Sequence, residues 1–135
     1  MTVIVGPYVA DFNETHIYNP KWTPHAKFHT GQTMSMGLYL GLSTLYFLWK
    51  PISNSASKEV QRSLEKERLG MAMVLAAMYW VTQLAAILYP GTLGYDPEFG
   101  EGFPQLWISG GHLTIGGLGY LLESRRIEKL GGKKD

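Results

Sequence analysis

Residues 69–89 have the sequence LGMAMVLAAMYWVTQLAAILY, which is 21 positions without Asp, Glu, Lys or Arg. A helix rises about 1.5 Å per residue, so about 20 residues cross the hydrocarbon core of a bilayer. Two further charge-free runs span residues 28–49 and 104–122. Helices of a small soluble domain are usually shorter and carry a polar face. The three runs predict an all-α membrane bundle with three spans, and the moderate apolarity of the first and third leaves a soluble helical bundle as the alternative.

Basic residues are concentrated on one side of this arrangement. Ten of the 12 Lys and Arg residues fall in the 50–68 connection and in the tail after residue 122, whereas the 90–103 connection has none. Cytosolic loops are enriched in Lys and Arg, so we expect 50–68 and the tail in the cytosol. The N-terminal segment and the 90–103 loop are then lumenal. For a fungal chain, these features predict an integral protein of the endoplasmic reticulum membrane.

The length of 135 residues suits one domain, and the sequence marks its helices. We expect helices at 24–49, 57–89 and 104–130, after a lumenal segment at 1–22. Thr23 and Pro24 form a typical helix start, with Thr as the N-cap and Pro in the first turn. VIVGPY at 3–8 fits either the end of a shortened apolar segment or a strand-like stretch. Without cysteine there is no disulfide or thiolate nucleophile, and the net charge of +1 gives no argument for nucleic-acid binding.

Polar and aromatic side chains converge on the predicted lumenal half of the bundle. Helical spacing places His25, His29, Gln32 and Met36 on one face of the first helix. The set continues with Tyr79, Trp80 and Gln83 on the second helix, and with Ser109 and His112 on the third. Polar groups at membrane depth are costly and usually face a bundle interior or a wet cavity. We therefore predict a pocket that opens to the lumen, roofed by the N-terminal segment and the 90–103 loop.

The residue types suggest roles within this pocket. The predicted catalytic residues are His29 and His112, which can move a proton, and Gln32 and Gln83, which can polarise a carbonyl. The predicted substrate-binding residues are Tyr79, Trp80, Ser109, Met36, His25, Glu14, His16 and Trp22. The aromatic rings can shape an apolar substrate or face a developing cation. The alternative is that these residues only form interhelical hydrogen bonds, packing contacts and interfacial belts.

A metal site is the competing interpretation of the histidines. His25 and His29 have the i, i+4 spacing of a metal-binding pair, and Glu14, His16 and His112 are potential further ligands. However, no carboxylate lies within the three apolar runs, and Lys27 interrupts the histidine motif. We therefore predict neither a tightly bound metal nor a cofactor.

Five glycines give the third predicted span an unusually small surface: Gly110, Gly111, Gly116, Gly117 and Gly119. In lipid, small residues allow helices to approach closely, so we expect this span to pack tightly against a neighbour. The alternative is that the glycines leave room for a ligand.

The segment GPYVADFNETHIYNPKWTPHAKFHTGQTMSMG, residues 6–37, resembles a family of small, largely uncharacterised bacterial and fungal membrane proteins. Their shared pattern runs roughly DWNxTHxxNPxWPPHAxFHxxQ, and the matching positions are Asp11, Asn13, Glu14, His16, Asn19, Pro20, Trp22, Pro24, His25, Phe28, His29 and Gln32. Family members usually begin with one more span, so the resemblance implies a fourth N-terminal span that is missing or shortened here. Fungal relatives resemble members of natural-product gene clusters, and small membrane isomerases and terpenoid cyclases are more loosely similar.

The expected function follows from the pocket and the resemblance together. We expect a cofactor-independent membrane enzyme that cyclises or isomerises a lipophilic secondary metabolite, either a terpenoid or a polyketide. The reaction would proceed by acid–base catalysis or as a pericyclic, Diels–Alder-type step that depends on shape and orientation. The expected partners are a lipophilic small molecule and membrane lipid, and a homo-oligomer is compatible with the sequence. The alternative is a non-enzymatic membrane helper subunit or small-ligand binder.

Overall fold

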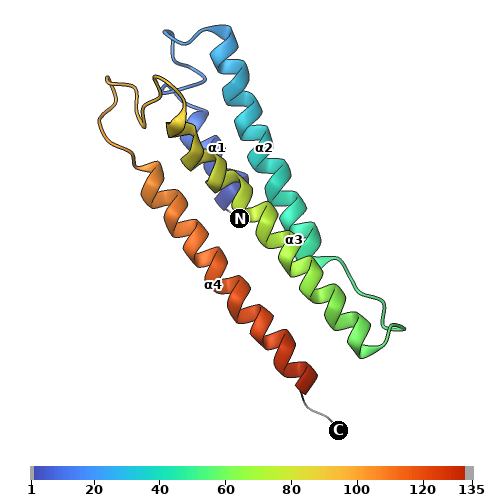
Figure 1. Cartoon of the computed structure of the whole chain (residues 1–135). Helices are drawn as coiled ribbons and strands as arrows, with labels where there is room; N and C mark the ends of the chain where they lie inside the picture. The colour runs from blue at the N-terminus through green and yellow to red at the C-terminus, as the bar shows by residue number, and fades with distance from the viewer. Residues whose placement is uncertain (1, 133–135) are drawn as a thin grey trace.

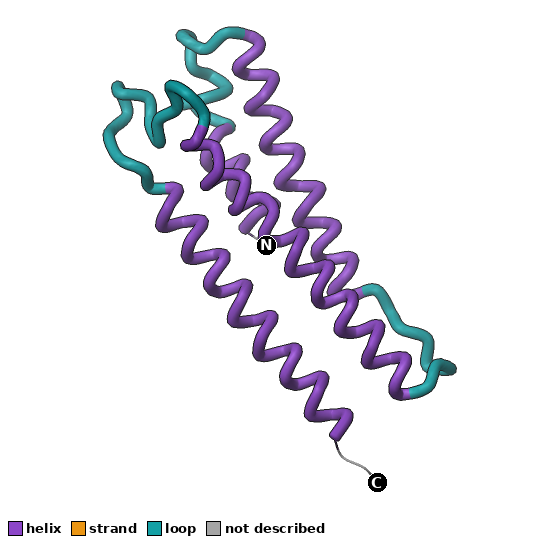
Figure 2. The backbone as a smooth tube through the Cα atoms, in the orientation of Figure 1, coloured by secondary structure: helices purple, strands orange, loops and turns teal. Residues whose placement is uncertain are grey.

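The computed structural model describes residues 2–132, with side-chain surroundings through residue 129, and this part of the chain contains helices and no strands. The elements are α1 (Thr2–Asp11), α2 (Pro24–Trp49), α3 (Lys58–Ala85), the short 3-10 helix η1 (Ala86–Leu88) and α4 (Gln105–Gly132). The three long helices run antiparallel, with α3 packed against both α2 and α4 (Figures 1 and 2). The all-α prediction is confirmed. α2 has the expected bounds and α4 lies within two residues of them, whereas α3 ends at Ala85, four residues before the expected end, and the short helix η1 follows it.

Local sequence explains where the long helices begin. The side chain of Thr23 accepts a hydrogen bond from the Ala26 N–H, and Pro24 occupies the first turn, where its missing N–H costs nothing. Ser57 caps α3 in the same way by accepting from the Val60 N–H. α2 ends at Trp49, one residue before Lys50-Pro51, because the residue that precedes a proline disfavours helical geometry.

α1 is a helix from Thr2 to Asp11, so the strand-like alternative for residues 3–8 is wrong. Its first half packs against α2 at Gly37 and Gly41. A Cβ added at Gly37 would lie 2.7 Å from the carbonyl oxygen of Val3, and one added at Gly41 would collide with the Ile4 side chain. The two glycines stand four residues apart, which is the small-xxx-small spacing of close helix pairs. The N-terminal segment at 1–22 therefore does more than cover the end of the bundle, because α1 is one of the packed helices.

The glycines of α4 do not have the expected packing role within the described part of the chain. An added Cβ would meet nothing within 4 Å at Gly110, Gly111, Gly117 or Gly119, and at Gly116 it would only reach ordinary contact with Met73. Close approach instead occurs on α2, where α1 crosses it. The prediction of tight glycine packing for the third span is therefore wrong.

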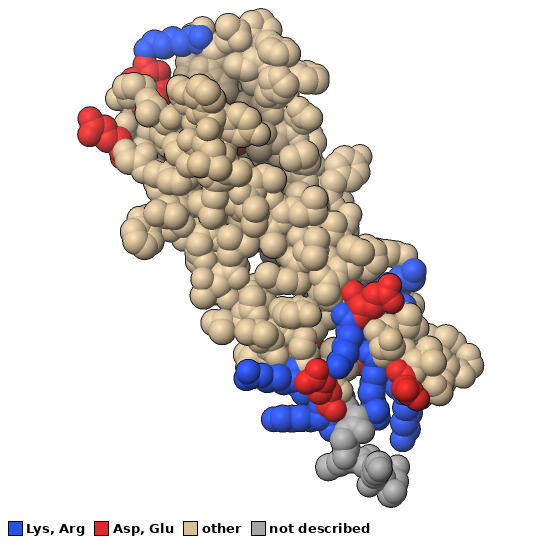
Figure 3. Space-filling model, in the orientation of Figure 1, with Lys and Arg blue, Asp and Glu red and all other residues tan. Residues whose placement is uncertain are grey.

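Charge and apolar surface are separated along the long axis of the molecule. Lys, Arg, Asp and Glu gather at the two ends, and the middle of the visible face carries none of them (Figure 3). Large apolar side chains in this middle zone are exposed on all three long helices, including Tyr39 at 72%, Val74 at 56% and Ile115 at 73%. One helix among the described residues, Lys58–Leu88, is long and apolar enough to cross a membrane, judged by length and composition. α2 and α4 do not meet this criterion, because polar side chains and glycines lower their mean hydropathy.

The segments between α1 and α2 and between η1 and α4 lie at the same end of the bundle, opposite the α2–α3 connection (Figure 1). Two contacts join them. Lys21 forms an ion pair with Glu98, and the Trp22 indole N–H donates to an Asp96 carboxylate oxygen at 3.1 Å. This end, which we call the loop end, carries the candidate site. The opposite end, which we call the basic end, holds most of the Lys and Arg residues.

Candidate functional site

An aromatic and polar cluster joins α3 to α4 near the loop end. The Trp80 and His112 rings are stacked, with centroids 4.1 Å apart and planes 12° from parallel. Tyr79 meets Trp80 edge-on at 5.3 Å. The Ser109 hydroxyl, which is fully buried, donates to the Gln83 side-chain oxygen at 2.7 Å. We call these five residues the aromatic cluster, and all five were expected at the site.

The hydrogen bonding of His112 fixes which ring nitrogen is available. His112 Nδ1 lies 2.7 Å from the carbonyl oxygen of Ile108, one turn earlier on α4. A carbonyl oxygen only accepts, so Nδ1 carries the proton of the neutral ring. Nε2 then bears the lone pair, and no described residue bonds to it. The half-buried ring therefore presents a free acceptor nitrogen, which is the arrangement that a general base needs.

A second cluster follows the end of α1, where the sequence is DFNETH. The Asn13 side-chain amide donates to the carbonyls of Val9 and Ala10, which fixes its orientation and caps the helix. The Asn13 side-chain oxygen then accepts from both the N–H and the hydroxyl of Thr15, at 2.8 and 2.6 Å. Because the Thr15 hydroxyl has given its one proton to Asn13, it must accept from His16 Nδ1, which lies 2.7 Å away.

This network orients His16 toward Asp11. With Nδ1 protonated, His16 Nε2 faces an Asp11 carboxylate oxygen at 3.7 Å. At this distance a protonated His16 would form an ion pair with the Asp11 carboxylate. Burial raises the pKa of the Asp11 carboxyl above its ordinary value, and the positive charge of a protonated His16 opposes part of that rise. Asp11 and His16 therefore face each other as an acid and a base.

The two clusters approach each other through Tyr79. The ring of Tyr79 lies beside α1, within 3.3 Å of the position that a Cβ on Gly37 would occupy, next to Pro7. Asp11 stands one turn beyond Pro7, close enough for its charge to act on the Tyr79 hydroxyl. Val3, Tyr79 and Trp80 form the buried core around which the other helices pack. Asp11 and His112 thus flank the Tyr79–Trp80 pair at the loop end.

Three predicted site residues lie elsewhere. His25, His29 and Gln32 are exposed on α2, where His29 contacts His25 through Nε2 at 3.1 Å and Gln32 through Nδ1 at 3.2 Å. The buried stripe of α2 is formed by Thr30, Met34, Gly37 and Gly41. The histidines project from a different side of the helix because they are offset from this stripe by about one third of a turn. A single pocket shared by His29, Gln32 and His112 is therefore not what the structure shows.

The remaining predicted contact residues divide in the same way. His16 and Trp22 meet edge-to-face, with ring centroids 4.7 Å apart, and belong with Asp11 in what we call the loop cluster: Asp11, Asn13, Thr15, His16, Trp22 and Asp96. Glu14 is exposed, and Met36 is 45% exposed on the outer side of α2. Neither residue reaches the two clusters through a described contact.

No group of three or more His, Asp or Glu side chains among the described residues is placed to hold a metal ion. The expected set of His25, His29, Glu14, His16 and His112 is divided among α2, the segment between α1 and α2, and α4. The exposed pair of His25 and His29 is the part of the set that stays together.

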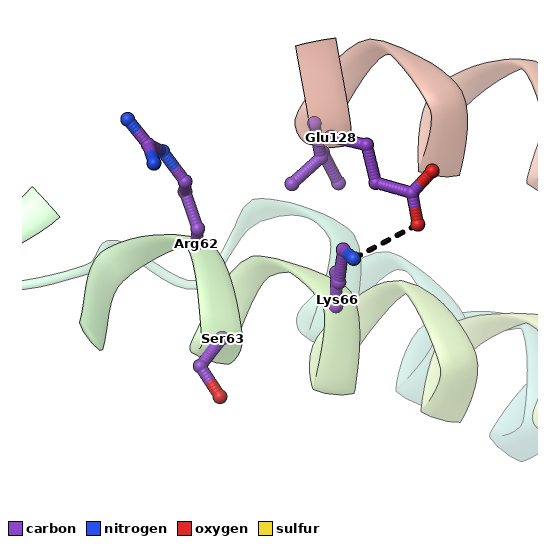
Figure 4. A pocket seen from close by; sticks show the side chains of 5 residues that line it. Arg62, Ser63, Lys66 and Glu128 are labelled. Atoms are coloured by element: carbon purple, nitrogen blue, oxygen red, sulfur yellow. Dashed lines mark hydrogen bonds and ion pairs between the residues drawn. The ribbon is translucent and has the colours of Figure 1, made fainter. Parts of the chain in front are cut away.

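Two cavities lie at the basic end. One has a volume of about 390 Å³ and lies between α3 and α4, where Lys66 points toward Glu128 and pairs with it at 2.9 Å (Figure 4). The other, of about 400 Å³, lies between the end of α2, α3 and α4. These two cavities lie at the end opposite the expected pocket, whereas the predicted residues that meet near the loop end form the packed aromatic cluster.

Sequence reasoning did not predict four residues of the loop cluster as site residues: Asp11, Asn13, Thr15 and Asp96. The signal for Asp11 was available, because it is a lone carboxylate that ends an apolar stretch. The spacing D-x-N-x-T-H then places a helix-capping Asn and an orienting Thr before the histidine. Nothing in the sequence pairs Asp96 with Trp22, since 74 positions separate them.

The fold and these clusters define a small all-helical protein with one helix suited to a membrane and two polar clusters at one end. The chain belongs to DUF6640, a family of unknown function, which matches residues 1–134. The expected membership of an uncharacterised family is therefore confirmed at that level. No curated protein and no solved structure matches the chain.

Proposed function

We propose that this protein is a cofactor-independent membrane enzyme that isomerises or cyclises a lipophilic metabolite, a terpenoid or a polyketide, at the loop end of its bundle. The observation that carries the proposal is the stack of His112 on Trp80, in which Nδ1 is bound by Ile108 and Nε2 is free. A basic nitrogen on the edge of a buried aromatic pair is suited to a proton transfer on an apolar substrate.

The exposed apolar belt supports the membrane location. A lone exposed apolar residue is ordinary, but a belt around all three long helices is typical of a surface that contacts lipid or protein. The charge-free middle in Figure 3 and the placement of ten of 12 basic residues on one side fit an integral protein with residues 50–68 and the tail in the cytosol.

Isomerisation by acid–base catalysis needs one group that removes a proton and one that returns it. His112 Nε2 is suited to remove a proton from carbon, and the Asp11–His16 pair is suited to deliver one at another carbon, so that the overall reaction conserves protons. Tyr79 and Trp80 lie between them and would contact the apolar skeleton or a developing cation. Gln83, held by Ser109, would polarise a substrate carbonyl.

The test is turnover by full-length protein purified in detergent, using terpenoid and polyketide substrates from its gene neighbourhood. We expect His112→Ala and Asp11→Asn each to reduce the rate at least about a hundredfold while the melting temperature stays near or above that of the wild type. His25→Ala is the matched control, because it removes an exposed histidine outside both clusters. Full activity in the His112→Ala/Asp11→Asn double variant would reject the site.

Running the same reaction in D₂O distinguishes the two mechanisms. Proton transfer through His112 and Asp11 would place solvent deuterium on a product carbon, whereas a pericyclic cyclisation would incorporate none. A pericyclic reaction would also tolerate His112→Gln and lose rate in Trp80→Ala, because shape would then dominate.

A specific observation favours a second candidate, a non-enzymatic helper subunit or small-ligand binder. The Ser109–Gln83 bond is partly buried, with Ser109 itself fully enclosed, and the Asn13–Thr15 network satisfies its own donors, as expected of polar groups that only hold helices together. In that case, variants in the two clusters would lose stability and partner function together, and no substrate would be converted.

A further inference from the structure

We propose that the cavity of about 400 Å³ at the basic end binds the headgroup of an anionic phospholipid. This inference rests on the membrane location proposed above, and it is independent of any catalytic activity. The cavity lies where the apolar belt meets the charged end, and its wall combines the two surfaces. Apolar side chains such as Phe47 and Leu69 line one part, and cations, carboxylates and amides of three helices and a connecting segment line the rest.

Three cations face this cavity from different elements: Lys50 at the end of α2, Arg68 on α3 and Arg126 on α4. Arg126 is occupied, since it forms an ion pair with Glu123 at 2.6 Å. Lys50 and Arg68 have no carboxylate partner among the described residues. Lys50 lies 5.2 Å from the centre of the Tyr46 ring, and Arg68 donates to the Lys50 carbonyl. Two cations therefore face the cavity without forming an ion pair among the described residues.

The acids that line the cavity do not cancel this excess. Glu123 is neutralised by Arg126, which leaves Glu65 against Lys50 and Arg68, a net charge of +1. Asn54 and Gln61 also line the wall, although Gln61 donates its amide to the carbonyls of Ser53 and Ala56. An anionic phosphodiester accepts from Lys and Arg, while its acyl chains continue along the apolar belt. Basic pockets between membrane helices on the cytosolic side bind such headgroups.

The experiment uses the full chain in an uncharged detergent at about 0.15 M salt, where distant surface charges are screened. The probes are phosphatidylglycerol, phosphatidylcholine and inorganic phosphate, and the readouts are the melting temperature and native mass spectrometry of retained lipid. We expect phosphatidylglycerol to raise the melting temperature and to be retained, with a clearly smaller effect from the other two probes. We expect Lys50→Gln and Arg68→Gln each to weaken the apparent affinity about tenfold.

The controls are Lys58→Gln and Lys129→Gln, which remove one charge at the same end without lining either cavity. Arg68→Gln also removes the bond to the Lys50 carbonyl, so Lys50→Gln decides the matter if Arg68→Gln fails to fold. Unchanged binding in Lys50→Gln, equal losses in the controls, or equal responses to phosphatidylglycerol and phosphatidylcholine would overturn the proposal. A full response to inorganic phosphate alone would also overturn it, since the ligand would then be a soluble anion. A chain that stays in solution without detergent would instead reject the membrane location.

Discussion

Asp11 is a half-buried carboxylate whose ionisation opposes folding. Burial raises its pKa in the folded chain, so the folded state holds this proton more tightly than the unfolded state does. The ionisation of Asp11 therefore lowers the free energy of unfolding as the pH rises from 3.8, the ordinary value, through the raised folded value. We expect Asp11→Asn, which cannot ionise, to be more stable than the wild type at neutral pH and equally stable in acid.

Melting temperatures in detergent from about pH 4 to about pH 8 check this expectation, with Asp96→Asn as an exposed control. Lower stability of Asp11→Asn at neutral pH would show that the attraction to His16 outweighs the cost of burial. If Asp11 also takes part in turnover, the same variant gains stability and loses activity, which is common at functional sites.

The Ser109–Gln83 bond is the clearest interhelical hydrogen bond of the aromatic cluster. Such bonds in membrane proteins average about 0.6 kcal/mol in double-mutant cycles. We expect Ser109→Ala and Gln83→Leu to show a coupling energy of about that size, because neither side chain keeps its partner after the change. The coupling is obtained from unfolding free energies of the two single variants and the double variant. A value near zero would mean that the two side chains find other partners.

At this scale, residue type and helical spacing predicted five of the side chains that meet in the aromatic cluster. They failed for His29 and Gln32, because shared spacing along one helix does not say which side of that helix is buried. The position of α1 decides that point, since it covers Gly37 and Gly41 and leaves the histidines outside.

α1 and α2 pack as a glycine-dependent helix pair. Pro7 has no N–H to donate to the Val3 carbonyl, and that oxygen lies against Gly37. A methyl group there would collide with backbone, which cannot move as a side chain can. We expect Gly37→Ala to destabilise the protein by about 1–3 kcal/mol, as overpacking usually does.

Gly111→Ala is the matched control for this change, because the same methyl group would meet nothing within 4 Å. It should be neutral, or more stable by about 0.5–1 kcal/mol through improved helix propensity. Unfolding in denaturant measures both variants. The reverse order of effects would mean that the α4 glycines carry a helix contact and that α1 is dispensable.

Element boundaries were largely predictable, because Thr23-Pro24, Ser57, Lys50-Pro51 and Pro90 are local signals that act through backbone geometry. The helical state of residues 2–11 could not be predicted in the same way, because a ten-residue segment with an internal proline has little helix preference on its own. Packing against α2 and α3 stabilises this helix, because its own sequence does not.

The arrangement of the whole molecule gives a direct test of its orientation in a membrane. The chain contains no cysteine, so a single introduced cysteine reports one position. Ser55 lies in the connection between α2 and α3, and Glu101 lies in the loop between η1 and α4, at the opposite end of the bundle (Figure 1). Both side chains are exposed, and Glu101 avoids the neighbouring Gly100, whose φ of 149° disfavours other residues.

Because ten of the 12 basic residues accompany Ser55, we expect Ser55→Cys to react with an impermeant maleimide only from the cytosolic side. Glu101→Cys should react only from the other side, in intact cells or sealed vesicles. Detergent permeabilisation, after which both must react, controls for accessibility. Labelling of both from one side would show that the bundle does not cross the membrane and that its apolar belt contacts something other than lipid. The reversed pattern would keep the bundle in the membrane and place the Asp11–His16 pair and His112 on the cytosolic side, where a soluble enzyme could deliver their substrate.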